Sequence, residues 1–274
     1  MELHEKLETA SRWLTDANGI LITAGAGMGV DSGLPDFRGE AGFWSAYPAL
    51  RTQSMSVQER ASGSLFLSRP DLAWGFYGHW LNLYRRVQPH PGFDILRRWS
   101  DGMEHGAFVF TSNVDGHFQK VGYPERRVVQ CHGTIHALQC ARPCSIDVWA
   151  ADEFYPEVDE EHCLLTSTIP KCPRCGGVAR PNILMFNDEG WIDTRRRRRL
   201  RLEAWLLTIA RWVVVELVAG RAIPTVRHMS ERNGPRIIRI STDDCAIEPG
   251  QGIGLPGRAL DVLKMLDEQV TGHG

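Results

Sequence analysis

Short apolar runs alternate with longer segments of helical spacing along most of the chain. The first run, Gly19–Ala24, opens into a glycine-rich turn, which is typical of a buried parallel strand. Similar runs follow at Ala107–Thr111, Arg127–Gln130, Trp212–Leu217 and Arg236–Ile240. Because helical segments separate most of these runs, the pattern predicts an α/β fold with a doubly wound parallel sheet.

Two long segments interrupt this alternation. Residues 43–98 have helical spacing and many aromatic side chains, so we expect a small helical module that folds over the glycine-rich turn. Residues 133–186 are rich in Cys and Pro and contain few regular runs, which predicts a metal-held insert. We therefore assign residues 1–132 and 187–274 to the sheet domain and residues 133–186 to a small metal-binding domain.

The composition narrows the classes of function. The formal net charge of −2 gives no global field that would attract nucleic acid or an anionic membrane. No apolar run approaches the roughly 18 residues of a membrane span, and residues 1–16 predict an amphipathic helix and not a signal peptide. Seven Cys at low density favour metal-bound thiolates in a reducing cytoplasm over disulfides. The arginine run Arg195–Arg199 predicts the solvated face of a helix that continues into Leu200–Ile209.

The glycine-rich turn supplies the first candidate binding residues. Glycines directly after a strand let the backbone approach a pyrophosphate at a helix N-terminus. No acidic residue follows on a second strand at the spacing of a dinucleotide dehydrogenase. The segment after the turn instead combines a carboxylate, an aromatic ring and a guanidinium, which suits ribose and phosphate binding better than hydride transfer. The candidate residues are Gly25, Ala26, Gly27, Asp36, Phe37 and Arg38.

Polar side chains follow the second and third predicted strands. In an open α/β sheet, ligands bind at the carboxyl ends of the strands, where Ser112, Asn113 and Asp115 would lie. Asn113 and Asp115 can fix a ribose hydroxyl, a carboxamide or a water, or they can cap a helix. His132 follows the third strand, and its ordinary pKa of about 6.5 suits proton transfer at neutral pH, although a histidine beside a glycine is also a common structural feature.

Two close cysteine pairs lie on either side of a loop. Four thiolates at this spacing predict one tetrahedral zinc ion, and because no coordination position stays open, the zinc would be structural. His162 and Cys163 lack a close partner at this spacing, so we expect that they are not ligands. The predicted ligands are Cys140, Cys144, Cys172 and Cys175.

In this order the motifs resemble those of the sirtuin family along nearly the whole chain. Residues 25–39 resemble its long signature from glycine to Pro-Asp-Phe-Arg-Gly, and residues 112–115 its Gln-Asn-Ile-Asp motif. Residues 132–133 are similar to its His-Gly pair, and residues 180–186 to its Arg-Pro return strand. The resemblance implies a Rossmann-like domain, a zinc-ribbon domain, and a cleft between them for NAD and acyl-lysine.

The implied activity is that of an NAD-dependent protein lysine deacylase, which releases nicotinamide and O-acyl-ADP-ribose. His132 and Asn113 would be catalytic, Asp115 would help to hold the ribose, Phe37 would shield the reactive carbon, and Arg38 would contact phosphate. NAD would be a co-substrate, zinc a structural cofactor, and acylated lysine side chains of proteins the partners. An NAD glycohydrolase or ADP-ribosyltransferase on the same scaffold, and a non-catalytic NAD-binding module, are the alternatives.

The chain departs from the family pattern in the loop on the adenosine side. The family's Gly-Thr-Ser sequence is not recognisable there, and Val218, Gly220 and Arg221 occupy the region, while Ser241 stands where the family has Asn. We expect Gly220 and Ser241 to contact NAD. Because a branched residue disfavours positive φ, we expect Val218 to crowd the site. Arg221 can either crowd the site or reach a phosphate, and we favour crowding, with weaker NAD binding, because Arg38 already offers a charge to the pyrophosphate.

Overall fold

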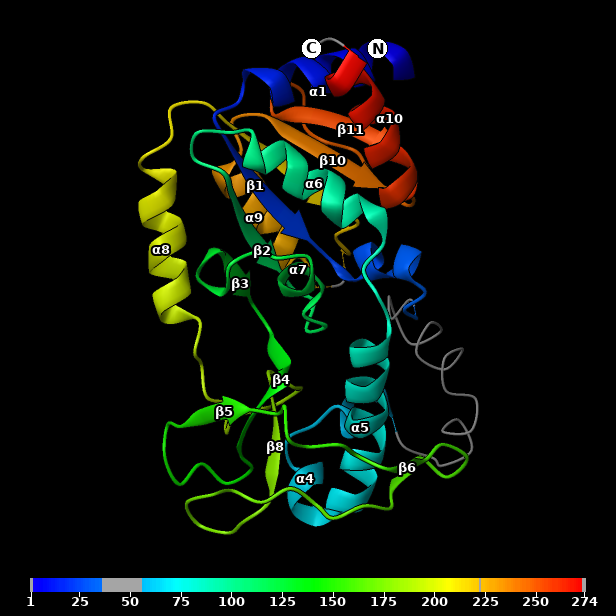
Figure 1. The fold of residues 1–274 in the computed structure, drawn as a ribbon, viewed down its shortest axis with the longest axis vertical. Coiled ribbons are helices and arrows are strands. Elements are labelled where there is room, and N and C mark those ends of the chain that lie inside the picture. Colours follow the sequence, from blue (N-terminus) through cyan, green and yellow to red (C-terminus); the bar gives the residue numbers. More distant parts are fainter. Residues whose placement is uncertain (1, 36–55, 222, 273–274) are drawn as a thin grey trace.

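The computed structural model describes residues 2–35, 56–221 and 223–272. A large domain carries a six-stranded sheet, and a smaller domain lies below it in the view of Figure 1. The strand order of the large sheet is β3-β2-β1-β9-β10-β11, and every pairing is parallel. This is the dinucleotide-binding order, in which the direction of winding reverses between β1 and β9. The strands are β1 Gly19–Ala24, β2 Ala107–Thr111, β3 Val128–Gln130, β9 Trp212–Leu217, β10 Ile237–Ser241 and β11 Gly252–Pro256.

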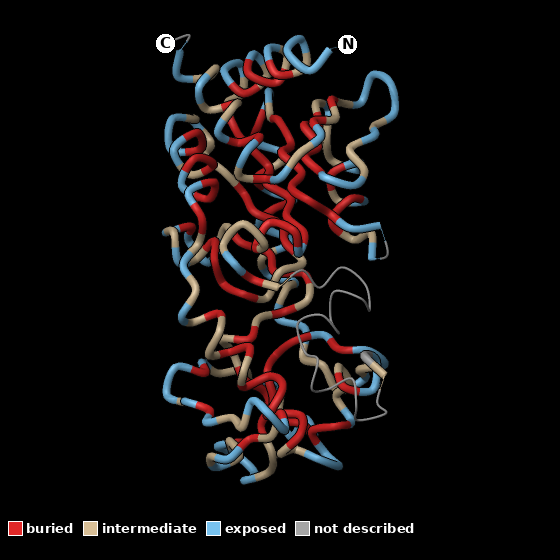
Figure 2. Tube along the Cα trace, turned by 90° about the vertical axis from the view of Figure 1, so that its right-hand side faces the viewer, coloured by how far each residue is buried: buried red, intermediate tan, exposed pale blue. Residues whose placement is uncertain are grey.

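Helices cover both faces of this sheet, as the predicted doubly wound fold requires. Alternate residues of β1 point to opposite faces, so Ile20 and Ile22 pack with one set of helices and Leu21 with the other. Figure 2 shows that the buried residues lie at the centre of the large domain, while the surrounding helices have exposed residues on their outer sides. One face carries α1 Leu3–Asp16, α6 Pro91–Asp101 and α10 Ala259–Gly272, and the other carries α8 Arg196–Leu206 and α9 Thr225–Asn233.

The small domain combines the cysteine-rich segment with most of the helical module. Its three-stranded antiparallel sheet has the order β5-β4-β8, and a short hairpin, β6–β7, lies beside it. One apolar core joins these strands to the helices. The elements are α3 Val57–Arg60, α4 Leu65–Ser68, α5 Pro70–Arg86, β4 Gly133–Cys140, β5 Val148–Ala150, β6 Val158–Asp159, β7 Leu164–Leu165 and β8 Ala179–Ile183.

The helical module therefore differs from the prediction for residues 43–98. Within its described part, α5 packs on the cysteine-rich segment, where the buried Trp74 Nε1 donates to the Ala179 carbonyl at 2.8 Å. Short strands alone bury little apolar surface, and the aromatic face of α5 supplies the missing core. In contrast, α6 belongs to the large domain, because Phe93 and Leu96 pack against the parallel sheet.

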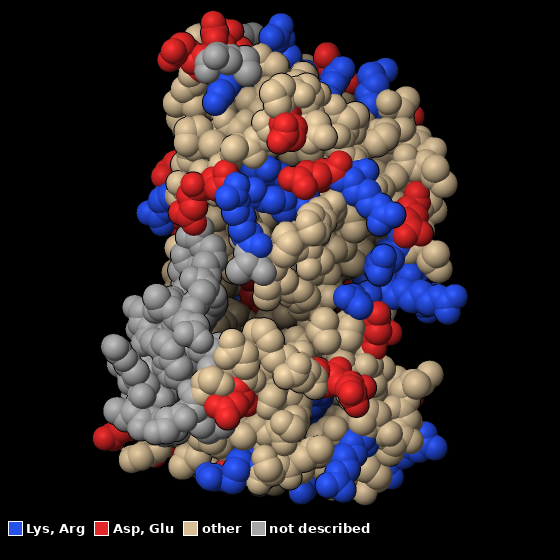
Figure 3. Space-filling model, turned by 180° about the vertical axis from the view of Figure 1, so that it is seen from behind, with Lys and Arg blue, Asp and Glu red and all other residues tan. Residues whose placement is uncertain are grey.

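The arginine run forms the start of α8, and its outer side chains are solvated as predicted. The helix is fixed to the sheet by Leu202 and Trp205, which are buried. Lys and Arg gather along the edge of the molecule where α8 lies (Figure 3). None of the helices in the described part is long and apolar enough to cross a bilayer. The exposed arginines are Arg196, Arg197, Arg199 and Arg201.

The contact between α5 and the β6–β7 hairpin gives a test of the shared core. A Cβ atom added at Gly75 would lie 2.0 Å from the backbone oxygen of Cys163. We expect Gly75→Ala to lower the free energy of unfolding by about 1–3 kcal/mol, because backbone atoms must shift. The matched control is Gly102→Ala, whose added Cβ would meet its nearest atom at 3.6 Å. Equal urea midpoints for the two variants would contradict the packing described.

Candidate active site

A cavity of about 540 Å³ lies at the carboxyl ends of the parallel strands, where the winding reverses. Its walls come from the segments that follow β1, β2, β3, β9 and β10, with Tyr84 from the end of α5. The fold thus gathers residues that are far apart in the sequence at the place where α/β sheets bind ligands. The predicted residues that line the cavity are Gly25, Ala26, Ser112, Asn113, Asp115, His132 and Gly220.

The glycine-rich turn is shaped by the loop after β9. A Cβ atom at Gly25 would lie 2.6 Å from the Val218 backbone oxygen, and one at Gly27 would lie 2.1 Å from Val218 Cγ1. Both positions therefore require glycine for close packing of protein segments, before any ligand is considered. Gly25 and Ala26 line the main cavity, whereas Gly27 lines a second cavity of about 300 Å³ together with Val218.

Val218 corrects the expectation from the sequence. It adopts φ +44° despite its branched side chain, and it is buried in the core of the large domain. Its backbone N–H donates to the Ile240 carbonyl at 2.8 Å, and its side chain packs over Gly27. These contacts impose the left-handed conformation that local preference disfavours. Val218 does not line the main cavity, so it does not crowd that cavity.

The turn after β2 serves both the cavity and the fold. The Asn113 N–H donates to Thr111 Oγ1 at 3.0 Å, and the half-buried Asn113 lines the cavity. Asp115 also lines it, while its Oδ1 accepts from the His117 N–H at 2.9 Å and so starts the short helix α7 His117–Lys120. Burial raises the pKa of Asp115. Asp115 thus both caps α7 and faces the cavity, so the two interpretations of this turn are compatible.

His132 stands at the junction of the two domains. Gly133 follows it at φ +82°, and a Cβ atom at Gly133 would lie 2.0 Å from the Asn182 oxygen, so the chain can enter β4 here only through glycine. Burial lowers the pKa of the imidazole, the nearby Arg195 lowers it further, and a hydrogen bond with the Ser112 backbone partly offsets this. The ring is therefore neutral at pH 7 and can accept a proton.

The loops after β9 and β10 add charged groups at the cavity wall. Arg221 and Asp243 both line the cavity. Ser241 does not line it, and its Oγ instead accepts from the backbone N–H groups of Asp243 and Asp244 at 3.3 and 3.2 Å. The predicted Ser241 thus shapes the turn that carries Asp243 to the cavity.

Several lining residues were not singled out in the sequence. Their signal is weak, because apolar residues in helices and turns show no chemistry until the fold brings them together. Asp36, Phe37 and Arg38 lie outside the described residues, and Pro35 is the last described residue before them. The additional apolar residues that line the cavity are Leu34, Tyr84, Val114, Ile223 and Val226.

The four predicted zinc ligands come together in the small domain. Their Sγ atoms all lie within 4.8 Å of one another, with Cys140 to Cys175 at 3.7 Å and Cys144 to Cys172 at 3.6 Å. These separations are too long for disulfides, and they match the sulfur–sulfur distance of about 3.8 Å expected around tetrahedral zinc. The cluster fits a structural zinc ion with four thiolate ligands.

His162 and Cys163 do not belong to this cluster, as predicted. The exposed His162 Nδ1 lies 2.7 Å from Asp159 Oδ2. Cys163 is buried against α5 at φ +54°.

Known proteins resemble this chain in sequence and in fold. The chain is 28% identical over 262 residues to an NAD-dependent protein deacylase of Pyrococcus abyssi (strain GE5 / Orsay), which covers 95% of this chain and 96% of that protein. It is 29% identical over 265 residues to NAD-dependent protein deacylase 2 of Pyrobaculum aerophilum, covering 94% and 93%. A solved Sir2 homolog–NAD complex has the same fold, with a TM-score of 0.72 at 20% identity over 97% of this chain and 94% of the other.

The structure of Sir2Tm bound to a propionylated peptide also shares the fold, with a TM-score of 0.68 at 16% identity over 96% of this chain and 98% of the other. The sequence profile of the Sir2 family matches residues 25–200, which include the glycine-rich turn, the strand-end residues and the four cysteines. Since this match spans more than half of the chain and agrees with the fold, the protein belongs to the Sir2 family.

Proposed function

We propose that this protein is an NAD-dependent protein lysine deacylase. The observation that supports this most is the neutral, half-buried His132 at the wall of a cavity that Asn113 and Asp115 also line. A cavity at the reversal point of a parallel sheet suits a dinucleotide. The names of the Pyrococcus and Pyrobaculum relatives favour the same activity.

In the proposed site, Gly25, Ala26 and Gly220 let backbone atoms approach NAD, and Asn113 and Asp115 hold its ribose, carboxamide or a water. Their positions on the cavity wall support these roles. NAD supplies a ribose carbon with nicotinamide as the leaving group when the acyl oxygen attacks. His132 then accepts a proton from a ribose hydroxyl, which prepares that oxygen to take the acyl group.

The acylated lysine would enter between the domains near β8. This strand lies at an edge of the small sheet, so it can pair with an added strand. Leu184 and Phe186 follow it and are exposed. Behind them, the buried Arg180 NH2 contacts Asp188 Oδ2 at 2.7 Å and stabilises the segment. We further propose a cytoplasmic location, because reduced thiolates are needed for the zinc site.

The amount of nicotinamide released with and without an acetyl-lysine peptide tests the proposed activity. Peptide-dependent release is expected for a deacylase, whereas peptide-independent release would indicate the alternative, an NAD glycohydrolase. His132→Ala should reduce deacylation, measured as formation of O-acyl-ADP-ribose, by about 10²–10⁴-fold but preserve ADP-ribose binding, because only the base of the acyl-transfer step is lost. His162→Ala is the matched control, since this histidine is exposed and does not line the cavity. Deacylation by His132→Ala within twofold of wild type would exclude the base role.

The pH dependence of kcat/KM tests the electrostatic environment of His132. A base works in its unprotonated form, so the rate should rise with pH through a pKa below about 6.5 and then level off. Arg195 disfavours the protonated ring, and Arg195→Met should therefore move the acid limb to higher pH. The exposed Arg196→Met is the control. An acid limb that stays in place or moves to lower pH in Arg195→Met would contradict this account.

Metal analysis tests the structural zinc. Cys172→Ser should lose the ion and unfold the small domain, because structural zinc supplies on the order of 10 kcal/mol of folding free energy. Cys245→Ser should keep one zinc per chain, since Cys245 lies outside the cluster. Zinc content by atomic emission and the rate of limited proteolysis are the measurements. One full equivalent of zinc in Cys172→Ser would refute the ligand assignment.

A further inference from the structure

Among the described residues that line the main cavity, acidic side chains outnumber permanently positive ones. Among its described lining residues, Asp115 and Asp243 carry carboxylates, and Arg221 is the one with a permanent positive charge. A dinucleotide brings two negative charges on its pyrophosphate. Because buried charge needs a partner, this arginine is the described group best suited to meet the phosphates.

Arg221 is held in place by an ion pair. Its Nε lies 2.6 Å from Asp244 Oδ2, and this is its sole ion pair with the described part of the chain. Asp244 is shared, because Arg227 NH1 approaches the same oxygen at 2.7 Å. One carboxylate therefore divides its charge between two guanidiniums, and Arg221, whose side chain is 73% exposed, retains donors for an anion.

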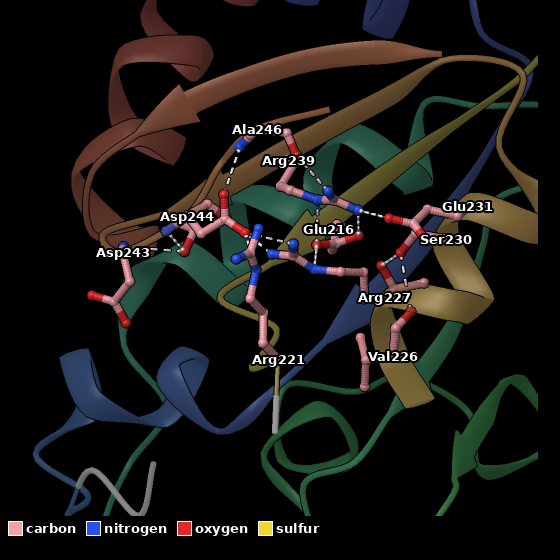
Figure 4. Close-up of polar contacts among 12 residues, drawn as sticks. Glu216, Arg221, Val226, Arg227, Ser230, Glu231, Arg239, Asp243, Asp244 and Ala246 are labelled. Carbon is pink, nitrogen blue, oxygen red and sulfur yellow. Dashed lines mark hydrogen bonds and ion pairs between the residues drawn. The ribbon is translucent and has the colours of Figure 1, made fainter. Parts of the chain in front are cut away.

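A buried network fixes Asp244 from behind (Figure 4). Arg227 NH2 also donates to the Asp244 backbone oxygen at 3.0 Å, and Arg227 Nε lies 3.9 Å from Glu216 Oε1. Glu216, fully buried in β9, accepts two hydrogen bonds from Arg239 of β10 at 2.7 and 3.0 Å. Side chains of alternating charge thus extend from the interior of the sheet to the cavity wall. The position of Arg221 depends on Asp244, which this buried network holds in place.

We infer that Arg221 binds the pyrophosphate of the dinucleotide and that Asp244 positions it. This inference rests on the proposed use of NAD. It replaces the expectation that the loop crowds the cavity, since Val218 packs away from the cavity and Arg221 is drawn toward the β10 loop. The arginine is therefore a specificity-determining residue for phosphate-bearing ligands, while Asp244 acts only through it.

Equilibrium binding of ADP-ribose and of adenosine separates charge recognition from general damage. Arg221→Met should weaken ADP-ribose binding by about 10–100-fold, because a charge-assisted hydrogen bond is lost, and change adenosine binding less than twofold. Arg221→Lys should recover part of the affinity. The control is Arg98→Met, which removes an exposed arginine that is paired with Asp267 at 2.6 Å and does not line the cavity.

Asp244→Asn should also weaken ADP-ribose binding, as Arg221→Met does. If this substitution displaces Arg221 from the cavity wall, the salt dependence of ADP-ribose binding should fall as well. In deacylation, Arg221→Met should raise the KM for NAD and leave kcat unchanged. Unchanged or tighter ADP-ribose binding by Arg221→Met would overturn the inference in favour of crowding. If the wild type binds ADP-ribose but does not deacylate, the proposed function fails while the comparison of variants still decides the role of Arg221. No binding of ADP-ribose by the wild type overturns both.

Discussion

The fold of the active site depends on the close approach of two loops at the point where the sheet reverses its winding. The ends of β1 and β9 lie so near each other that neither Gly25 nor Gly27 has room for a Cβ atom. Val218 fills the available space and takes a left-handed conformation to do so. Ala26 and Gly220, which lie beside this contact in the chain, both line the cavity.

Gly25 and Gly27 of the glycine-rich turn are therefore required for packing, besides any role in ligand binding. Its glycines were interpreted from sequence as a means for the backbone to approach a ligand, yet the protein itself already requires them. A substitution at Gly27 would push against Val218 before it reached any phosphate. Loss of cofactor binding in such a variant would therefore report the packing of the loop as well as ligand contact, and the two effects must be measured separately.

Much of the fold could be predicted from sequence, because the central strands are buried on both faces. Continuous apolar runs therefore gave β1, β2 and β9 with the bounds that the structure has. The edge strand β11 was missed, since it contains Gly252 and Gly254, where added Cβ atoms would lie 2.2 and 2.0 Å from backbone oxygens. Because close packing requires glycine at these positions, β11 lacks the continuous apolar run by which the other strands were predicted. The spacing of the helices likewise could not show that α5 and α6 pack in different domains.

The candidate site was predictable where a polar residue lies just past the end of a strand, two positions on, as for Asn113 and His132. It was not predictable for Tyr84 or Asp243, because their contribution depends on how a helix end and a turn pack in three dimensions. Ser241 illustrates the limit. Its position at a strand end was correct, but its hydroxyl is satisfied by the following backbone and is directed to the turn.

The helices at the two ends of the chain, α1 and α10, pack against each other at the pole of the large domain opposite the small domain (Figure 1). The core beneath them contains Leu7 and Leu266, and neither helix lines the main cavity. An affinity handle or a fused fluorescent protein attached at either end would therefore stand clear of the substrate entrance.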